Sequence, residues 1–240
     1  MKISLIGCGN MGKNHARILR ELGALDAIIE TDEKRLEELE HLEYGSFLQS
    51  DIESTNSDGY VIATPSSTHY KILSSVLEKT NAVLLEKPAL SSIQEYDLVA
   101  ANFDTSKVCV GHIERFNPAV TKAKESYSKS TKRCEFYRYS QRPQQIADTG
   151  VWRDLGVHDV DLMVYLLGAP QNVISHGVLH NGVDVSFHAN FSFINGIIAS
   201  LNVSCLATVK RRSIHIYGKE VYTTVDLLNQ RIAHVSDHEM

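Results

Sequence analysis

Short apolar runs alternate with stretches of helical periodicity over the first half of the chain. The apolar runs predict buried strands at residues 3–6, 27–29, 60–63, 82–85 and 108–110. The periodic stretches predict helices at residues 11–22, 33–42, 70–77 and 94–101. In the first helix, Ala16, Ile18, Leu19 and Leu22 are expected to face inward. Alternating strands and helices imply right-handed crossovers and a parallel sheet that is covered on both faces.

The pattern changes beyond about Pro118. A helix is predicted over residues 152–167, ended by Gly168 and Pro170. Strand-like runs follow at residues 173–179, 183–191, 197–203, 213–217 and 221–227. Asn195-Gly196 lies between two of them and predicts a two-residue hairpin. This half therefore reads as an antiparallel sheet with a helix on one face.

A glycine-rich segment follows the first predicted strand and opens the first helix. Gly7-Cys8-Gly9-Asn10-Met11-Gly12 is a G-x-G-x-x-G in the context that the dinucleotide fingerprint requires. Its glycines allow a tight turn and a close approach to a pyrophosphate, which rests on the helix N-terminus. Without a ligand it would be a plain glycine turn. The segment predicts a Rossmann domain that binds a dinucleotide.

An acidic residue ends the second predicted strand. Glu30 lies 23 residues after Gly7, where a carboxylate bonds the adenosine ribose hydroxyls and repels a 2′-phosphate. Asp32 is a nearby competitor for this role, and a solvated acid at a strand end is the plain alternative. The pattern favours NAD over NADP.

Two further segments follow apolar strands at the edge where open α/β sheets bind ligands. Thr64-Pro65-Ser66 follows residues 60–63, and His69 comes one turn later; Thr64, Pro65 and His69 are candidate cofactor contacts. Glu86-Lys87-Pro88 follows residues 82–85. We expect Glu86 to touch the cofactor and the Lys87 ammonium to stabilise an alkoxide-like substrate oxygen. An ordinary turn and a surface lysine are the alternatives.

The helix of the second half carries a possible acid–base pair. Asp154 and His158 are spaced i, i+4 and share one helix face, with Asp161 further along. A neutral imidazole is a competent base near pH 7, and a carboxylate stabilises its protonated form. Such a pair in isolation is more often structural, so the assignment depends on the other motifs.

These elements together predict an α/β fold. An N-terminal Rossmann domain with a doubly wound parallel sheet is expected over residues 1–117. A smaller α+β domain with a mostly antiparallel sheet, for substrate binding and dimerisation, is expected over residues 118–240. An exposed antiparallel sheet often serves as a dimer face, so a homo-oligomer through this sheet is expected.

Composition narrows the partners. Lys and Arg number 24 against 29 Asp and Glu, which leaves no global field for nucleic acid or an anionic membrane. No apolar stretch approaches a membrane span, and the few apolar residues before Cys8 are too short for a secretory signal. The four cysteines form no C-x-x-C pair, so neither a metal site nor a disulfide framework is indicated. A cytoplasmic protein is expected.

In combination these motifs resemble those of the glucose-fructose oxidoreductase/inositol dehydrogenase family of NAD(P)-dependent sugar dehydrogenases. The matching segments are the glycine motif, Ala63-Thr64-Pro65, Glu86-Lys87-Pro88, and Asp154 with His158. The resemblance implies that Lys87, Asp154 and His158 form the catalytic set. Residues 111–118 and 148–161 are similar to a narrower branch that oxidises the 3-hydroxyl of UDP-N-acetylglucosamine. Family members usually continue past this chain's end, so a shortened second domain is expected.

The reading that follows is an oxidoreductase that moves a hydride from a secondary alcohol of a sugar or nucleotide sugar to NAD. Arg115, Asn117 and Arg142 are the candidate contacts for a nucleotide-sugar diphosphate. Arg115 could instead tie the two domains together. Which of Lys87 and His158 takes the proton first stays open. A methyltransferase and a non-catalytic dinucleotide-binding protein are the alternative functions.

Overall fold

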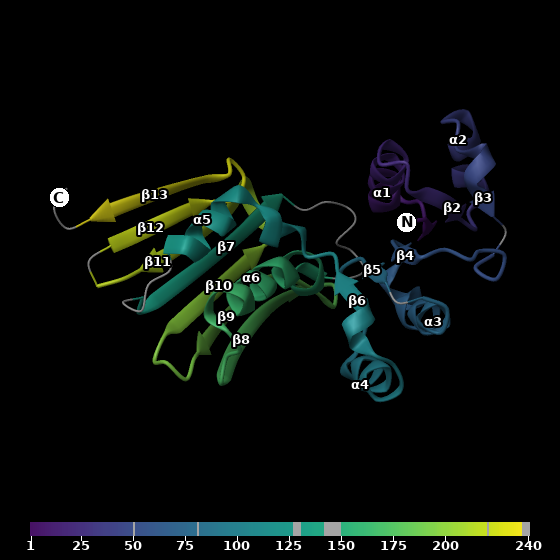
Figure 1. Ribbon diagram of the computed structural model, residues 1–240. Coiled ribbons are helices and arrows are strands. Elements are labelled where there is room, and N and C mark those ends of the chain that lie inside the picture. Colours follow the sequence, from purple (N-terminus) through teal and green to yellow (C-terminus); the bar gives the residue numbers. More distant parts are fainter. Residues whose placement is uncertain (50, 81, 127–130, 142–149, 220, 237–240) are drawn as a thin grey trace. The chain divides into compact units, whose positions relative to one another are not determined.

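The chain forms two compact units, Met1–Gly111 and His112–Met240. The computed structural model describes residues 1–49, 51–80, 82–126, 131–141, 150–219 and 221–236 (Figure 1). The division between the units lies a few residues before the boundary expected at 117/118. That boundary stays a prediction.

Among the described residues, the first unit is built on a six-stranded sheet in the order β3-β2-β1-β4-β5-β6. The strands are β1 (Ile3–Ile6), β2 (Leu25–Ile29), β3 (Leu48–Gln49), β4 (Gly59–Ile62), β5 (Val83–Leu85) and β6 (Val108–Val110). The helices are α1 (Asn10–Glu21), α2 (Glu33–His41), α3 (Ser66–Leu77) and α4 (Ile93–Asn102), with short 3-10 turns η1 (Gly45–Phe47) and η2 (Thr105–Lys107). Every pairing is parallel. This is the doubly wound Rossmann order, as predicted.

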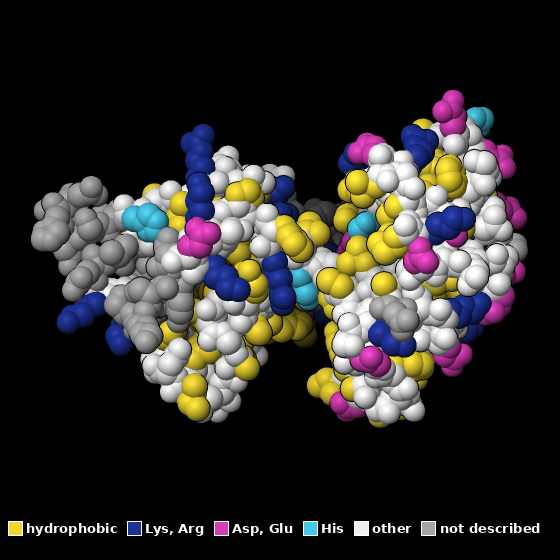
Figure 2. Space-filling model, viewed as in Figure 1, with side chains coloured by type: hydrophobic (Ala, Val, Ile, Leu, Met, Phe, Trp, Pro, Cys, Tyr) yellow, Lys and Arg dark blue, Asp and Glu magenta, His cyan; other side chains and the backbone are white. Residues whose placement is uncertain are grey.

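Alternation along the strands gives this sheet two buried faces. Leu5 and Ile28 pack with Leu19 of α1, whereas Ile6 and Ile62 belong to the core on the other face. Successive side chains of a strand point to opposite faces, so a run of apolar residues fills both cores. Acidic side chains gather over the outer helix α2 (Figure 2), of which only Leu39 is buried among the described residues.

The prediction for the inward face of α1 was wrong at two positions. Ala16 and Leu19 are buried, but Ile18 is 43% exposed and Leu22 is 73% exposed. Gly12, Ala16 and Leu19 follow the i, i+4, i+7 stripe that faces the sheet. Ile18 lies beside that stripe, and Leu22 is the C-cap after the last helical turn.

The second unit holds a seven-stranded sheet, counted over the described residues, in the order β13-β12-β11-β7-β10-β9-β8. The strands are β7 (Arg133–Gln141), β8 (Asn172–His180), β9 (Val183–Ser192), β10 (Ile198–Ser204), β11 (Leu206–Tyr217), β12 (Val221–Asp226) and β13 (Arg231–Ser236). The helical segments are the 3-10 turn η3 (Ile113–Phe116), α5 (Pro118–Ser126), the π-helical turn η5 (Trp152–Gly156) and α6 (Val157–Leu167). Among the described strands of this second sheet, only β7 and β10 pair in parallel, so the sheet is mostly antiparallel, as predicted.

Helices α5 and α6 contribute to one core on a single face of this sheet (Figure 1). Ala119 of α5 and Leu162 of α6 are fully buried with Phe136, Leu201 and Ile214 of the strands. The other face of the sheet carries the alternate, more polar positions of the same strands. Within the described part of the chain, no helix has the length and apolar character needed to cross a membrane.

The turn between β9 and β10 differs from the two-residue hairpin that was expected. Gly196 N–H donates to the Phe193 carbonyl and Phe193 N–H donates to the Ile197 carbonyl, so residues 194–196 form the loop. Gly196 adopts a φ of 78°. A left-handed glycine that closes a three-residue loop is a common hairpin variant. Asn195-Gly196 therefore marked the hairpin correctly but not its length.

A buried ion pair lies between the sheet and α6. Arg138 is 1% exposed, and its Nε lies 2.5 Å from Oδ2 of the fully buried Asp159. Glu114 of η3 accepts two further bonds from Arg138 at 3.2 Å. Arg138 points into the core from the middle of β7. Its charge interrupts the alternation of apolar and polar residues, which is the pattern that predicts a strand from sequence.

We predict that Asp159→Asn destabilises the protein by about 3–5 kcal/mol, because it leaves the Arg138 charge buried with half of its compensation. Denaturant titration followed by circular dichroism measures the free energy of unfolding. The matched control is Glu21→Gln, which breaks the exposed Arg17–Glu21 pair and should cost less than about 1 kcal/mol. Equal, small losses in both variants would contradict the role assigned to the buried pair.

Candidate active site

The carboxyl edge of the first unit's sheet brings together the loops that follow adjacent strands. One backbone hydrogen bond continues the ladder beyond each strand end: the N–H groups of Gly7, Ala63, Glu86 and Gly111 donate to the carbonyls of Ile29, Ile6, Ile62 and Leu85, respectively. The glycine loop, the Thr64 loop and the Lys87 loop therefore begin at one edge. This is where open α/β sheets bind their ligands.

The glycine loop is packed against its neighbours at two of its glycines and open at the third. Gly7 has a φ of +85°, and a Cβ there would lie 2.6 Å from Thr64 Cγ2. A Cβ on Gly12 would lie 2.2 Å from the Gly7 carbonyl oxygen. At Gly9 the nearest atoms, those of Arg35, are 4.0 Å away. The protein itself thus leaves space at Gly9.

The start of α1 fits a pyrophosphate at that space. Gly9 is the N-cap of α1 and supplies no side-chain cap, so no cap occupies the N–H groups of the first turn. Such N–H groups, together with the helix dipole, attract phosphate oxygens. Asn10 and Met11, both exposed, form that turn. The geometry is consistent with the predicted cofactor contacts of this segment, which stay predictions.

Glu30 is a buried carboxylate held by backbone donors. Its Oε2 accepts from Cys8 N–H at 2.8 Å, and its Oε1 accepts from the N–H groups of Thr31 and Asp32 at 2.8 and 3.0 Å. Burial raises the pKa of Glu30, but these three bonds and the Arg35 guanidinium 3.6 Å away lower it overall. Glu30 is therefore ionised, and a carboxylate with about four acceptor positions keeps one for a ribose hydroxyl.

Asp32, the competitor for this role, has another partner. It is the N-cap of α2, and its Oδ1 accepts from Arg35 N–H at 3.1 Å. Satisfying the free N–H groups of a helix start is the usual role of Asp at this position. The geometry favours Glu30 as the ribose ligand.

The loop after β4 is arranged around a buried histidine. Thr64 Oγ1 accepts from the Thr68 hydroxyl at 2.8 Å, and the exposed Pro65 is the N-cap of α3. His69 is 1% exposed, and its Nε2 lies 2.9 Å from the Thr64 carbonyl oxygen. The cofactor contacts expected of Thr64, Pro65 and His69 stay predictions.

Glu86 is held by a residue that the sequence reasoning missed. Its buried Oε1 lies 2.8 Å from Nε2 of His15 on α1, and Lys87 N–H donates to Oε2 at 3.2 Å. Burial raises the pKa of Glu86, but the hydrogen bond and charge of His15 and the Lys87 charge lower it overall. His15 lies on the same stripe of α1 as Gly12 and Leu19. A polar residue on this buried stripe is the sequence feature that could have identified His15 as a partner of a buried group.

Asp154 and His158 lie at an irregular helix start in the second unit. Residues Trp152–Gly156 form a π-helical turn before α6, so the spacing of the pair is not purely α-helical as assumed. Trp152 anchors this turn, because its backbone N–H donates to Asp184 Oδ2 at 2.7 Å and its ring centroid lies 4.4 Å from that of Phe187. π-Helical turns occur frequently at functional sites. Sequence periodicity carries no signal for such a turn.

The sequence analysis also missed a cation whose charge acts on Asp154. Arg212 of β11 is about one-third exposed at its side chain, and its Nη1 lies 3.5 Å from Glu114 Oε1. Burial and the Arg138 charge lower the pKa of Arg212, whereas Glu114 and Asp154 act in the opposite direction. Asp154 therefore lies in the field of a guanidinium.

Arg115 and Asn117, two of the three predicted diphosphate contacts, bond to other residues of the second unit. Arg115 forms a bidentate pair with Asp161 at 2.8 and 2.5 Å. Asn117 caps α5 by accepting from Ala119 N–H at 3.0 Å, and it donates to the Leu227 carbonyl. Arg142 lies outside the described residues. All three contacts stay predictions, and no group of three metal-ligating side chains occurs among the residues that the structure describes.

Family models match both units. The model of the oxidoreductase family with an NAD-binding Rossmann fold matches residues 1–113, and the model of the GFO/IDH/MocA C-terminal domain matches residues 125–222. Together they cover most of the chain. Their order along the chain is that of the two units in the structure.

Curated relatives include several dehydrogenases. UDP-N-acetylglucosamine 3-dehydrogenase of Acidithiobacillus ferrooxidans is 26% identical over 238 residues, which are 97% of this chain and 76% of the relative. Inositol 2-dehydrogenase 2 of Saccharopolyspora erythraea is 29% identical over 183 residues, 70% of this chain and 54% of the relative. The chain thus spans about three quarters of the first relative and about half of the second.

Solved structures share the fold across nearly the whole chain. The UDP-N-acetylglucosamine 3-dehydrogenase of A. ferrooxidans superposes with a TM-score of 0.90 at 24% identity, covering 99% of this chain and 80% of that one. The WlbA dehydrogenase of Bordetella pertussis, in complex with NADH and UDP-GlcNAcA, superposes at 0.85 with 22% identity, covering 97% and 76%. With its NAD-binding Rossmann domain followed by the matching C-terminal domain, the chain belongs to the GFO/IDH/MocA family of oxidoreductases.

Proposed function

We propose that the protein oxidises a secondary alcohol of a sugar or nucleotide sugar, with NAD as the hydride acceptor. The observation that carries this proposal is the arrangement of the sheet edge in the first unit. There the ionised Glu30 and the open space at Gly9 fit the cofactor, and the loop of Lys87 begins at the same sheet edge, after β5. The names of the relatives support the alcohol as substrate.

The proposal assigns a separate role to each residue of the catalytic set. Bound NAD would accept the hydride from the alcohol carbon. His158 takes the proton of the hydroxyl, and the Lys87 ammonium stabilises the developing negative charge on oxygen. Asp154, in the field of Arg212, balances the charge that His158 gains.

UDP-N-acetylglucosamine, oxidised at C3, is the substrate we favour. The support is the relative that covers nearly the whole chain, whereas the inositol dehydrogenase covers less of it. Arg115 contacts the diphosphate in this proposal, because its side chain is 41% exposed beside Asp161. Asn117 and Arg142 remain further candidates. The second candidate function is dinucleotide binding without catalysis.

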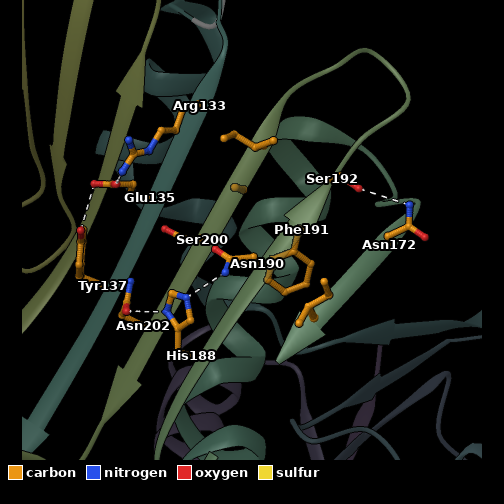
Figure 3. A pocket seen from close by; sticks show the side chains of 13 residues that line it. Arg133, Glu135, Tyr137, Asn172, His188, Asn190, Phe191, Ser192, Ser200 and Asn202 are labelled. Carbon is orange, nitrogen blue, oxygen red and sulfur yellow. Dashed lines mark hydrogen bonds and ion pairs between the residues drawn. The ribbon is translucent and has the colours of Figure 1, made fainter. Parts of the chain in front are cut away.

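We also propose that two copies associate in the cytoplasm through the open face of the second unit's sheet. A hollow of about 530 Å³ lies on this face. Figure 3 shows polar side chains that line it, among them Glu135, His188 and Asn202. The exposed Ile174 and Ile198 also line it. Exposed apolar side chains set among polar ones are typical of an interface.

We expect Ile198→Arg to shift the protein from dimer to monomer, because it places a charge in the buried part of this interface. Sedimentation velocity at micromolar concentration measures the change. Ile93→Arg, at a 75% exposed position in the first unit, is the control and should leave the mass unchanged. A wild-type monomer, or a dimer that persists in Ile198→Arg, would refute the interface.

The function itself is tested by a screen of sugars, inositols and nucleotide sugars for NADH formation at 340 nm. We expect turnover on UDP-N-acetylglucosamine. Lys87→Ala and His158→Ala should each lower turnover by on the order of 10²-fold or more, with the Kd for NAD little changed. In wild type, kcat/KM should fall on the acid side as imidazole protonates, and His158→Ala should lose this limb.

NAD binding without turnover on any compound of the screen would instead identify the non-catalytic alternative. Turnover on inositols or free sugars would remove the nucleotide-sugar assignment and keep the dehydrogenase. Near-normal turnover of either alanine variant would remove that residue from the mechanism.

Glu30 should set the cofactor preference. We expect wild type to bind NAD more tightly than NADP, because the carboxylate repels a 2′-phosphate. Glu30→Ala should reduce the ratio of the NADP dissociation constant to the NAD dissociation constant by roughly tenfold, about 1.4 kcal/mol. The Arg35 guanidinium then faces the phosphate alone, so Glu30→Ala/Arg35→Ala should bind NADP more weakly than Glu30→Ala. Isothermal titration calorimetry gives the constants, and a wild-type preference for NADP would overturn the assignment.

A further inference from the structure

His69 bridges the loop that follows β4 and the loop that follows β5. It belongs to α3 and is 1% exposed. Its Nδ1 lies 3.1 Å from the Pro88 carbonyl oxygen and 3.0 Å from the Ala89 carbonyl oxygen. Its Nε2 lies 2.9 Å from the Thr64 carbonyl oxygen. Both nitrogens of a buried ring therefore face carbonyl oxygens.

Carbonyl oxygens accept hydrogen bonds and cannot donate them. A neutral imidazole has one N–H donor, and its other nitrogen is an acceptor. Whichever nitrogen carries the N–H, the ring donates to a carbonyl of one loop and lies directly against a carbonyl of the other.

The position of these carbonyls links His69 to Lys87. Pro88 and Ala89 directly follow Lys87, and Glu86 directly precedes it and is held by His15. The backbone after Lys87 is thus held by one histidine, and the side chain before it by another. Glu86 N–H also continues the ladder of β4. The polypeptide on both sides of Lys87 is fixed.

We propose that His69 is a positioning residue for Lys87. Its buried ring lies between the Pro88–Ala89 backbone and the Thr64 loop, so that it fixes the spacing of the two loops and thereby the place of Lys87. The functional part of this inference rests on the proposed role of Lys87 in alcohol oxidation. It also gives His69 a role other than the direct cofactor contact expected from its sequence position.

The positioning role is tested with graded variants. His69→Leu removes both ring nitrogens, whereas His69→Asn keeps an amide donor close to the position of Nδ1. In His69→Leu, amide hydrogen exchange of the segment 85–91 should become faster than in wild type, and kcat should fall by on the order of tenfold or more because Lys87 is misplaced. The Kd for NAD should change by less than about threefold, since the glycine loop is untouched. His69→Asn should fall between wild type and His69→Leu in both readouts.

His41→Leu, at an exposed histidine on α2, is the control for the same substitution in the same unit and should match wild type. A folded His69→Leu with unchanged exchange in segment 85–91 would overturn the positioning role. If His69→Leu does not fold, His69→Asn decides: the inference requires faster exchange there as well. Faster exchange in His69→Leu, combined with no turnover in wild type, would support the structural role of His69 and refute only the proposed function.

Discussion

Parallel strands must all end at the same edge of their sheet, and the candidate cofactor site depends on this constraint. The hydrogen-bond ladder of β2, β1, β4 and β5 continues for one residue beyond the strands, and it presents the glycine loop, Glu30, the Thr64 loop and Lys87 at one edge. A ladder of fixed register leaves these backbones little freedom. Specificity is then a matter of which side chains follow each strand.

Buried carboxylates connect elements in both units, each with a matched set of donors. Glu30 accepts three backbone N–H bonds, Glu86 binds His15, and Asp159 pairs with Arg138. Burial alone would favour the protonated acids, and the donors reverse this for Glu30 and Glu86. Removing such a donor leaves an uncompensated charge, which makes these contacts more sensitive to substitution than surface pairs.

The sequence predicted the elements that follow simple periodicity and missed those that do not. Short apolar runs located β1, β4 and β5, and the glycine motif located the start of α1, because these signals are local. Strand β7 was missed because Arg138 points into the core, and the π-helical turn at Asp154 has no periodic signature. The partners of His69 and Glu86 come from distant segments, so only tertiary structure shows that these side chains hold loops.

The central claim is that a hydride passes from a sugar carbon to NAD on this protein. Mass spectrometry of the cofactor after incubation with NAD and UDP-N-acetylglucosamine deuterated at C3 tests it most directly. The account predicts that the deuterium appears in the reduced nicotinamide in step with loss of the labelled alcohol. Reduced cofactor without deuterium, or a labelled substrate that stays intact while NAD is bound, would contradict it.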